Sequence, residues 1–280
     1  MPIVPSKEIV EDAYRRGYAI PAINTQGGNY EIVRACIETA CEMNSPMIVQ
    51  VYPANTNYYG LNWLVVTATA LSDKYDIPIA IHLDHGKSEE IVYDAIKAGF
   101  TSVMLDYSHE SLKNNIAAIQ RLLPIAALKG VSVEAELGSV NRVGEELTNK
   151  ATPQDVTTFL SQTKVDMLAV GIGNAHGHYV GEPDIDTSLL AEIKKVSGTT
   201  PLVLHGTSGI PSSVIKECIQ LGMAKVNVGT FIREQCISYY KDVLNSEGDT
   251  HVFKRMDKVT SLLKEDVRNL ILTFGSDNKV

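Results

Sequence analysis

The sequence predicts an α/β protein in which eight parallel strands close into a barrel, the (β/α)8 or TIM-barrel fold. Short β-branched segments alternate with longer amphipathic segments along the chain, as in a parallel sheet with connecting helices. Eight such units fit within 280 residues, a length typical of this fold. Neither a Gly/Ser-rich linker nor a shift in composition divides the chain, so we expect a single domain over residues 1–280.

The predicted elements follow one another in a regular order. Strands are expected at residues 18–24, 46–52, 77–83, 101–107, 131–137, 167–173, 201–206 and 225–230. Between them, apolar residues at helical spacing predict helices, several of which end at a glycine. These lie at 30–44, 61–75, 88–99, 112–130, 153–163, 186–196 and 211–222, and a helical extension is expected over 247–280. An open, doubly wound sheet would also alternate strands and helices, but eight strands without a second domain favour closure.

Composition excludes several classes of protein. Hydrophobic residues make up 44% of the chain and charged residues 21%, unlike disordered or fibrous proteins. The net charge of −8 argues against a nucleic-acid partner. No apolar run reaches the roughly 18 residues of a membrane span, and the N-terminal segment has no stretch suited to a signal peptide. Four cysteines without zinc-ligand spacing are expected to be buried, reduced thiols, so we expect a cytoplasmic protein with no membrane partner.

Histidines follow three separate predicted strands. In a barrel the C-terminal strand ends meet at one face, so His85, His176 and His205 can converge there and leave a metal position open for substrate. A lone histidine at a strand end is more often only hydrogen-bonded, but three together beside carboxylates favour a zinc site. His178 is an alternative to His176, because residues two apart share a face.

The alternation of side chains along a strand sorts other candidates. We expect Ile81 and Leu83 to face the barrel interior, which would turn His82 toward the helix layer. Lys225 begins its strand and is expected on the wrong face for a site. No lysine stands at the C-terminal end of a predicted strand, which argues against a Schiff-base nucleophile.

Carboxylates stand beside the predicted metal site. An acid/base group next to a Lewis-acidic metal can move a proton while the metal stabilises charge on a carbonyl oxygen, and Asp84 is placed for this role. The alternative is that Asp84 caps the next helix, although Ser88 suits that role better. Asp106 and Glu136 could bind a second divalent ion, lie in the outer shell of the first metal, or only anchor the barrel mouth.

Two glycine-containing segments follow the seventh and eighth strands, at residues 205–209 and 227–230. Barrels often hold phosphate at this position on backbone N–H groups and helix N-termini. The alternative is a pair of tight turns that need glycine for positive φ.

Residues 171–177 look like a dinucleotide-binding fingerprint, but the third glycine is one residue late and no phosphate-binding helix follows.

Seven parts of the chain carry a family resemblance. They are YAIPAIN at 18–24, HLDHG at 82–86, VMLD at 103–106 with SH at 108–109, VEAELG at 133–138, AHG at 175–177, LVLHGTSG at 202–209 and KVNV at 225–228. Together they cover nearly the whole chain. The sequence thus resembles the class II, zinc-dependent ketose-bisphosphate aldolases, in particular the tagatose- and fructose-bisphosphate aldolases.

This resemblance implies a lyase that reversibly cleaves a phosphorylated ketose to dihydroxyacetone phosphate and an aldehyde. His85, His176 and His205 would bind Zn2+, Asp84 would take the proton of the C4 hydroxyl, and Asn227 would hold the donor ketone and its enediolate. The residues expected around the donor phosphate, with Na+ or K+ as a further ligand, are Gly177, Gly206, Ser208 and Thr230. Further candidates for substrate binding are Asn24, Thr207 and Gly229. We also expect a homodimer or homotetramer.

One segment departs from the family pattern. The family has Gly-Gly-x-Glu-Asp after the position of Gly138, whereas this chain has SVNRVGEE, so the acceptor need not be glyceraldehyde 3-phosphate. The predicted loop 139–150 exceeds the usual two to six residues, and we expect a mobile lid. Glu145 or Glu146 would protonate the enediolate, unless they are a solvated pair, and Arg142 would meet an anionic acceptor.

Two other functions stay open at this point. A zinc hydrolase on the same barrel would use water bound to the metal, and it would not release an aldehyde from a phosphorylated ketose. A catalytically silent sugar-phosphate-binding protein is the other alternative, although Asp84 beside three intact ligands argues against it.

Overall fold

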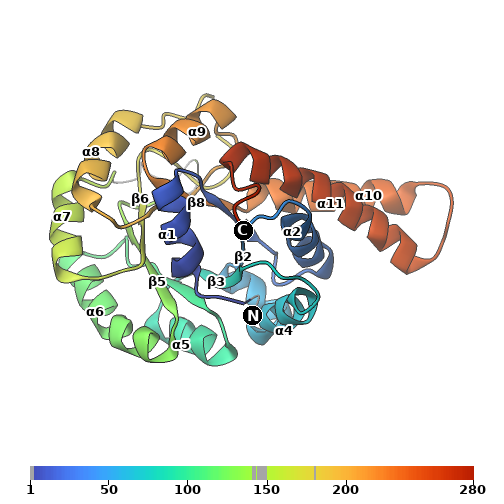
Figure 1. Cartoon of the computed structure of the whole chain (residues 1–280), viewed down its shortest axis with the longest axis horizontal. Coiled ribbons are helices and arrows are strands. Elements are labelled where there is room, and N and C mark those ends of the chain that lie inside the picture. The colour runs from blue at the N-terminus through green and yellow to red at the C-terminus, as the bar shows by residue number, and fades with distance from the viewer. Residues whose placement is uncertain (1–2, 141–142, 144–149, 180) are drawn as a thin grey trace.

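A parallel β-barrel forms the centre of the computed structural model, which describes residues 3–140, 143, 150–179 and 181–280. Within these residues eight strands pair in chain order, and β8 closes the barrel by pairing with β1 (Figure 1). The strands are β1 (Ile20–Asn24), β2 (Met47–Val51), β3 (Ile79–Gly86), β4 (Ser102–Leu105), β5 (Ser132–Leu137), β6 (Met167–Val170), β7 (Leu202–Leu204) and β8 (Met223–Val228). Each lies within or overlaps a predicted strand, which confirms the predicted fold.

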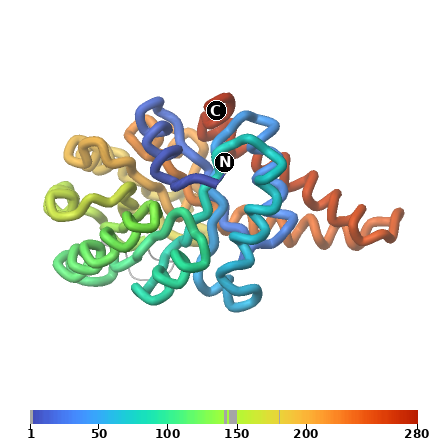
Figure 2. The backbone as a smooth tube through the Cα atoms, turned by 60° about the horizontal axis from the view of Figure 1, so that its bottom comes forward, coloured from blue at the N-terminus to red at the C-terminus, as the bar shows by residue number. Residues whose placement is uncertain are grey.

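Helices surround the barrel. The predicted ones are α2 (Tyr30–Glu42), α4 (Asn62–Ser72), α5 (Glu89–Ala98), α6 (Leu112–Lys129), α7 (Pro153–Gln162), α8 (Thr187–Ser197), α9 (Ser212–Gln220) and α11 (Val252–Phe274). Four helices of the described residues were not predicted: α1 (Ser6–Arg16), α10 (Thr230–Asn245), and the short η1 (Pro53–Asn55) and α3 (Thr56–Tyr59). Helices α10 and α11 form a hairpin that extends beyond the ring of helices (Figures 1 and 2). Among the residues that the structure describes, none of the helices could span a membrane.

Helix α1 closes one end of the barrel. Ile9, Val10 and Ala13 pack against side chains of the barrel interior. The Ser6 hydroxyl, at the start of the helix, donates a hydrogen bond of 2.7 Å to the Ser102 hydroxyl inside the barrel. The opposite end, formed by the C-terminal ends of the strands, is therefore the one that remains open for a site.

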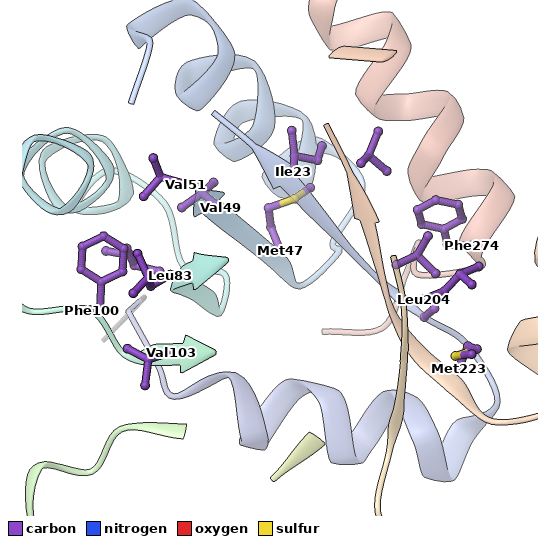
Figure 3. Packing of buried hydrophobic residues seen from close by; sticks show 14 of the residues in the cluster. Ile23, Met47, Val49, Val51, Leu83, Phe100, Val103, Leu204, Met223 and Phe274 are labelled. Atoms are coloured by element: carbon purple, nitrogen blue, oxygen red, sulfur yellow. The ribbon is translucent and has the colours of Figure 1, made fainter. Parts of the chain in front are cut away.

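The strand faces separate two apolar clusters. The interior cluster includes Ala80, whereas Ile81 and Leu83 belong to the larger cluster between strands and helices. Figure 3 shows Leu83 with Phe100 among the side chains of this outer layer. The predicted orientation of β3 was therefore wrong. His82 faces inward, where its Nδ1 lies 2.7 Å from the Ser102 hydroxyl.

All four cysteines are free thiols. Cys36, Cys218 and Cys236 are buried and Cys41 is partly buried, close to the prediction.

Candidate active site

An open cavity of about 690 Å³ lies at the C-terminal ends of the strands. It brings together most of the site residues predicted from the sequence. Those that line it are Asn24, Asp84, His85, Asp106, His176, Gly177, Gly206, Thr207, Ser208, Asn227, Gly229 and Thr230. Two further predicted residues, His205 and Glu136, are buried and lie next to His85.

The end of β3 places two adjacent residues in the same site. Regular strand geometry would send Asp84 and His85 to opposite faces. The register between β3 and β4 shifts between Leu83 and Gly86, and His85 has a left-handed backbone conformation with φ of 50°. A side chain at Gly86 would lie 2.6 Å from the carbonyl oxygen of Met104, so only glycine fits this bend. The predicted loss of strand geometry at this point is confirmed.

Hydrogen bonds to neighbouring carboxylates orient two of the three histidines. Nδ1 of His85 lies 2.8 Å from Oδ2 of Asp106, and Nε2 of His205 lies 2.8 Å from Oε1 of Glu134. Each of these nitrogens therefore donates its proton to a carboxylate, which in a neutral imidazole leaves the other ring nitrogen with a lone pair. The two remaining nitrogens, Nε2 of His85 and Nδ1 of His205, face each other at 2.8 Å. Two lone pairs at this distance repel unless a cation, a proton or a metal ion, lies between them.

The third histidine reaches the same point from the loop after β6. Ligand atoms of His85, His176 and His205 all lie within 4.8 Å of one another, which suits a single metal ion. His178 is exposed instead, and its Nε2 lies 2.7 Å from Glu234. Of the two alternatives considered, His176 is thus the one that joins the group.

Carboxylates make the site strongly negative. Burial would lower the pKa of His85, but the charge of Asp84 and the hydrogen bond to Asp106 raise it to about 10. Burial and the charge of Asp106 raise the pKa of Glu136 to about 8. Among the described residues, Oε2 of Glu136 has no hydrogen-bond partner, and it lies 3.7 Å from Nδ1 of His205. Three imidazoles, an unpaired carboxylate oxygen and this negative potential fit a divalent cation.

Asp84 is held by two amides. Its Oδ1 accepts a hydrogen bond of 3.0 Å from Asn227 Nδ2, and its Oδ2 accepts one of 3.2 Å from Gln50 Nε2. The carboxylate lies 3.8 Å from Nε2 of His85 and reaches the cavity. Gln50 was not predicted, although a lone polar residue in the apolar strand β2 was a usable signal.

The glycine-containing loops form another wall of the cavity. Helix α10 begins at Thr230 directly after Gly229, so its N-terminal N–H groups face this wall. The Thr207 hydroxyl donates a hydrogen bond of 2.6 Å to the backbone oxygen of Asn227 and ties the two loops together. Gly206 has φ of 62°, and a side chain there would lie 2.4 Å from the carbonyl oxygen of Ala175.

Several charged residues of this site were not predicted from the sequence. Arg233, Lys87 and His109 line the cavity. Lys225 does not lie on the wrong face, because it points into the barrel and donates a hydrogen bond to Glu134. The predicted lid residues Arg142, Glu145 and Glu146 lie outside the described residues.

Comparison with known proteins identifies close relatives. A family model described as fructose-bisphosphate aldolase class-II matches residues 4–279. The probable fructose-bisphosphate aldolase of Bacillus subtilis (strain 168) is 37% identical over 287 residues, covering 100% of both chains. The fructose-bisphosphate aldolase of Staphylococcus aureus (strain Mu50 / ATCC 700699) is also 37% identical, over 100% of this chain and 99% of its own.

Solved structures of aldolases also match this chain. The YdjI aldolase from Escherichia coli K12 matches with a TM-score of 0.88 and 30% identity over 99% of both chains. A putative fructose-1,6-biphosphate aldolase from Coccidioides immitis matches with a TM-score of 0.87 and 27% identity, over 97% of this chain and 96% of its own.

Proposed function

Because the chain belongs to the class II fructose-bisphosphate aldolase family, a family of lyases, we propose that it cleaves a phosphorylated ketose to dihydroxyacetone phosphate and an aldehyde in this cavity. The observation that carries this proposal is the position of Asp84. A carboxylate with both oxygens held by amides stands beside three convergent histidines, so a base and a metal position share one site.

We propose Zn2+ as the metal, with His85, His176 and His205 as its ligands. When bound, zinc would polarise the ketone carbonyl and stabilise negative charge on its oxygen. Asp106 would act through His85 by holding Nδ1, and Glu136 would offer its unpaired oxygen as a further ligand. Binding of a second divalent ion at Asp106 and Glu136, or of Na+ or K+ beside the phosphate, stays a prediction.

The proton chemistry follows from the amides around Asp84. In the cleavage direction Asp84 would accept the proton of the C4 hydroxyl, and the C3–C4 bond would break as C4 becomes the aldehyde. The electron pair of that bond would pass to the donor fragment as its enediolate. Asn227, which lines the cavity and donates to Asp84, would orient that carboxylate and contact the donor. Protonation of the enediolate by Glu145 or Glu146 stays a prediction from the sequence.

The donor phosphate would occupy the wall formed by the two glycine-containing loops. Backbone N–H groups at the start of α10 favour an anion, and the hydroxyls of Thr207, Ser208 and Thr230 can donate to phosphate oxygens. Gly177, Gly206 and Gly229 would let the backbone approach it closely, while Asn24 would contact the sugar.

Cleavage assays test the proposed reaction. Zinc-loaded protein is offered fructose 1,6-bisphosphate, tagatose 1,6-bisphosphate and ketose monophosphates, and dihydroxyacetone phosphate is measured with a coupled dehydrogenase. In the reverse direction, dihydroxyacetone phosphate is offered with phosphorylated and unphosphorylated aldehydes. Formation of the donor from at least one ketose supports the proposal. If inorganic phosphate is released without an aldehyde, the protein is a hydrolase instead. If the sugar phosphates bind but are not converted, the protein is a catalytically silent binding protein.

We also propose a homodimer or homotetramer. Leu244, Val252 and Phe253 expose apolar surface where α10 and α11 extend from the barrel, which supports association. Light scattering on the purified protein measures its mass directly. The cytoplasmic location stays a prediction from the sequence.

A further inference from the structure

A charged residue that the proposed reaction does not use lies inside the barrel. Lys225 is fully buried on β8, two residues before Asn227, and is not among the residues that line the cavity in the described chain. Its ammonium group donates hydrogen bonds of 2.9 Å to Oε2 of Glu134 and 2.7 Å to Oδ1 of Asn227. Burial of a charge is unfavourable unless the charge is paired and hydrogen-bonded. The role of Lys225 must therefore be sought in these two partners.

The first partner controls a histidine. The fully buried ammonium group of Lys225 donates to Oε2 of Glu134 at 2.9 Å and pairs with it as a carboxylate. Its second oxygen lies 2.8 Å from Nε2 of His205. The Asn227 amide nitrogen lies farther from Nε2, at 3.2 Å. Glu134 is therefore the nearer partner, so Nε2 donates its proton to the carboxylate and the lone pair stays on Nδ1, the nitrogen that faces His85. Without this acceptor at Nε2, the choice of tautomer would be lost.

The second partner controls the proposed base. Lys225 donates to the oxygen of the Asn227 amide, so the amide nitrogen must point the other way, where it donates to Asp84 at 3.0 Å. An inverted amide would place its oxygen against the Asp84 carboxylate and its NH2 group against the ammonium group. Both contacts would be repulsive. Lys225 therefore fixes which end of Asn227 faces Asp84.

We propose that Lys225 is a positioning residue that sets, through Glu134, the tautomer of His205 and, through Asn227, the hydrogen bond to Asp84. One buried ammonium group thus aligns a metal ligand and the acid/base group at the same time. The inference rests on the proposed function where it takes His205 as a ligand and Asp84 as a base, but the tautomer itself is a property of the metal-free protein.

Substitution of Lys225 by methionine tests the inference. The variant keeps the length of the side chain and removes the charge. In metal-free protein with 15N-labelled histidines, we expect His205 to change from one Nε2–H tautomer to a mixture. Chelator competition should show zinc or Co2+ affinity reduced about 10- to 100-fold, as for other residues that orient a ligand. With saturating zinc, kcat should fall more than the KM of the donor changes, because the Asn227–Asp84 contact is lost.

Matched variants separate positioning from a general loss of packing. Ser102→Ala removes two buried hydrogen bonds from the same interior, those with Ser6 and His82, without a direct contact to Glu134 or Asn227, and it should leave zinc affinity within about twofold. In Glu134→Gln, His205 should also change from the single Nε2–H tautomer to a mixture. This variant tests the inference by itself if Lys225→Met does not fold. Lys225→Arg, which keeps the charge, should retain the tautomer.

These measurements test the role of Lys225 whether or not the protein cleaves a ketose phosphate. A single Nε2–H tautomer and unchanged zinc affinity in Lys225→Met would overturn it. It would also be overturned if Ser102→Ala weakened zinc binding as much as Lys225→Met does. If the parent protein cleaves no ketose phosphate, the proposed function fails, yet the 15N measurement on metal-free protein still decides whether Lys225 positions His205.

Discussion

Asp84 and His85 are neighbours in sequence, and the bend at the end of β3 brings both side chains into one site. A left-handed conformation at a residue other than glycine costs about 1–3 kcal/mol. At His85 this cost is offset by the hydrogen bond between its Nδ1 and Asp106, and by the backbone hydrogen bond of 2.9 Å that the Asp106 N–H donates to the carbonyl oxygen of Gly86. A strained residue held in this way is typical of a functional site. It brings the two adjacent residues into positions that suit the different roles proposed for them, metal ligand for His85 and base for Asp84.

Asp84→Ala tests this division of roles. Loss of a general acid/base group lowers a rate by about 10²- to 10⁴-fold, and we expect this loss in ketose cleavage by the variant. Zinc content should be unchanged, because the three histidines remain. Steady-state kinetics and metal analysis on the same preparation check both expectations. His178→Ala, an exposed histidine outside the metal group, should match the parent protein. Near-normal turnover of zinc-loaded Asp84→Ala would assign the base elsewhere.

The sequence predicted that the three histidines lie together, but it did not predict the orientation of β3. The topology of a barrel brings all C-terminal strand ends together, so His85, His176 and His205 could be grouped without knowing which way each strand faces. The direction of His82 was predicted wrongly for a physical reason. Both faces of a barrel strand are buried, and a strand such as β3 has apolar residues on each, so hydrophobicity does not identify the inner face.

The loops after β7 and β8 act as one element, because the Thr207 hydroxyl ties them together. Their positions were predictable, since glycines and small polar residues directly follow the last two strands. The positions of the positively charged side chains of the site could not be predicted from the sequence. Arg233 lies on α10, a helix that was not predicted, and Lys87 lies in the short connection between β3 and α5. Charged side chains occur on every exposed helix face, so composition alone does not single them out.

Gly206→Ala tests the phosphate wall. The added methyl group would lie 2.4 Å from the carbonyl oxygen of Ala175, so the loop must move, and we expect the KM of dihydroxyacetone phosphate to rise at least tenfold. Gly17→Ala is the matched control. It has a similar φ, 72° against 62°, but no atom within 4 Å of the added methyl group. It should lose stability through the left-handed conformation alone, by about 1–2 kcal/mol, with unchanged kinetics. Equal KM values in the two variants would place the phosphate elsewhere.

Arg233→Ala tests recognition of the acceptor. Arg233 lies in the first turn of α10 and lines the cavity, where a guanidinium group can bind an anion through two hydrogen bonds. We expect the KM of a phosphorylated aldehyde to rise about tenfold, which corresponds to about 1.4 kcal/mol, while that of an unphosphorylated aldehyde changes little. Lys241→Ala, an exposed cation on the same helix away from the cavity, serves as control. A similar rise for both aldehydes would exclude recognition of the acceptor charge.

On the scale of the whole molecule, polar contacts run through the barrel from its closed end to its open end. Ser6 of α1 contacts Ser102, and Ser102 contacts His82. His82 lies 3.6 Å from Glu134, which is paired with Lys225 below the site. Removing one member of a buried ion pair typically costs about 3–5 kcal/mol, whereas replacing both by apolar residues is often neutral. Because Lys225 and Glu134 also contact residues of the site, we infer that the main role of the pair is to position those residues, and that stabilisation of the fold is secondary.

Metal binding should stabilise the whole barrel, because the three histidines come from β3 and from the loops after β6 and β7. A ligand at 100 times its Kd stabilises the native state by about 2.7 kcal/mol. For a chain of this size each kcal/mol raises Tm by about 2–4 °C, so zinc should raise Tm by roughly 5–10 °C over protein treated with EDTA. Differential scanning calorimetry checks this at constant protein concentration, since association also affects Tm. His205→Ala should bind little zinc and show no such rise, while Asp84→Ala should keep it. Equal Tm values with zinc and with EDTA in the parent protein would show that these histidines hold no metal ion.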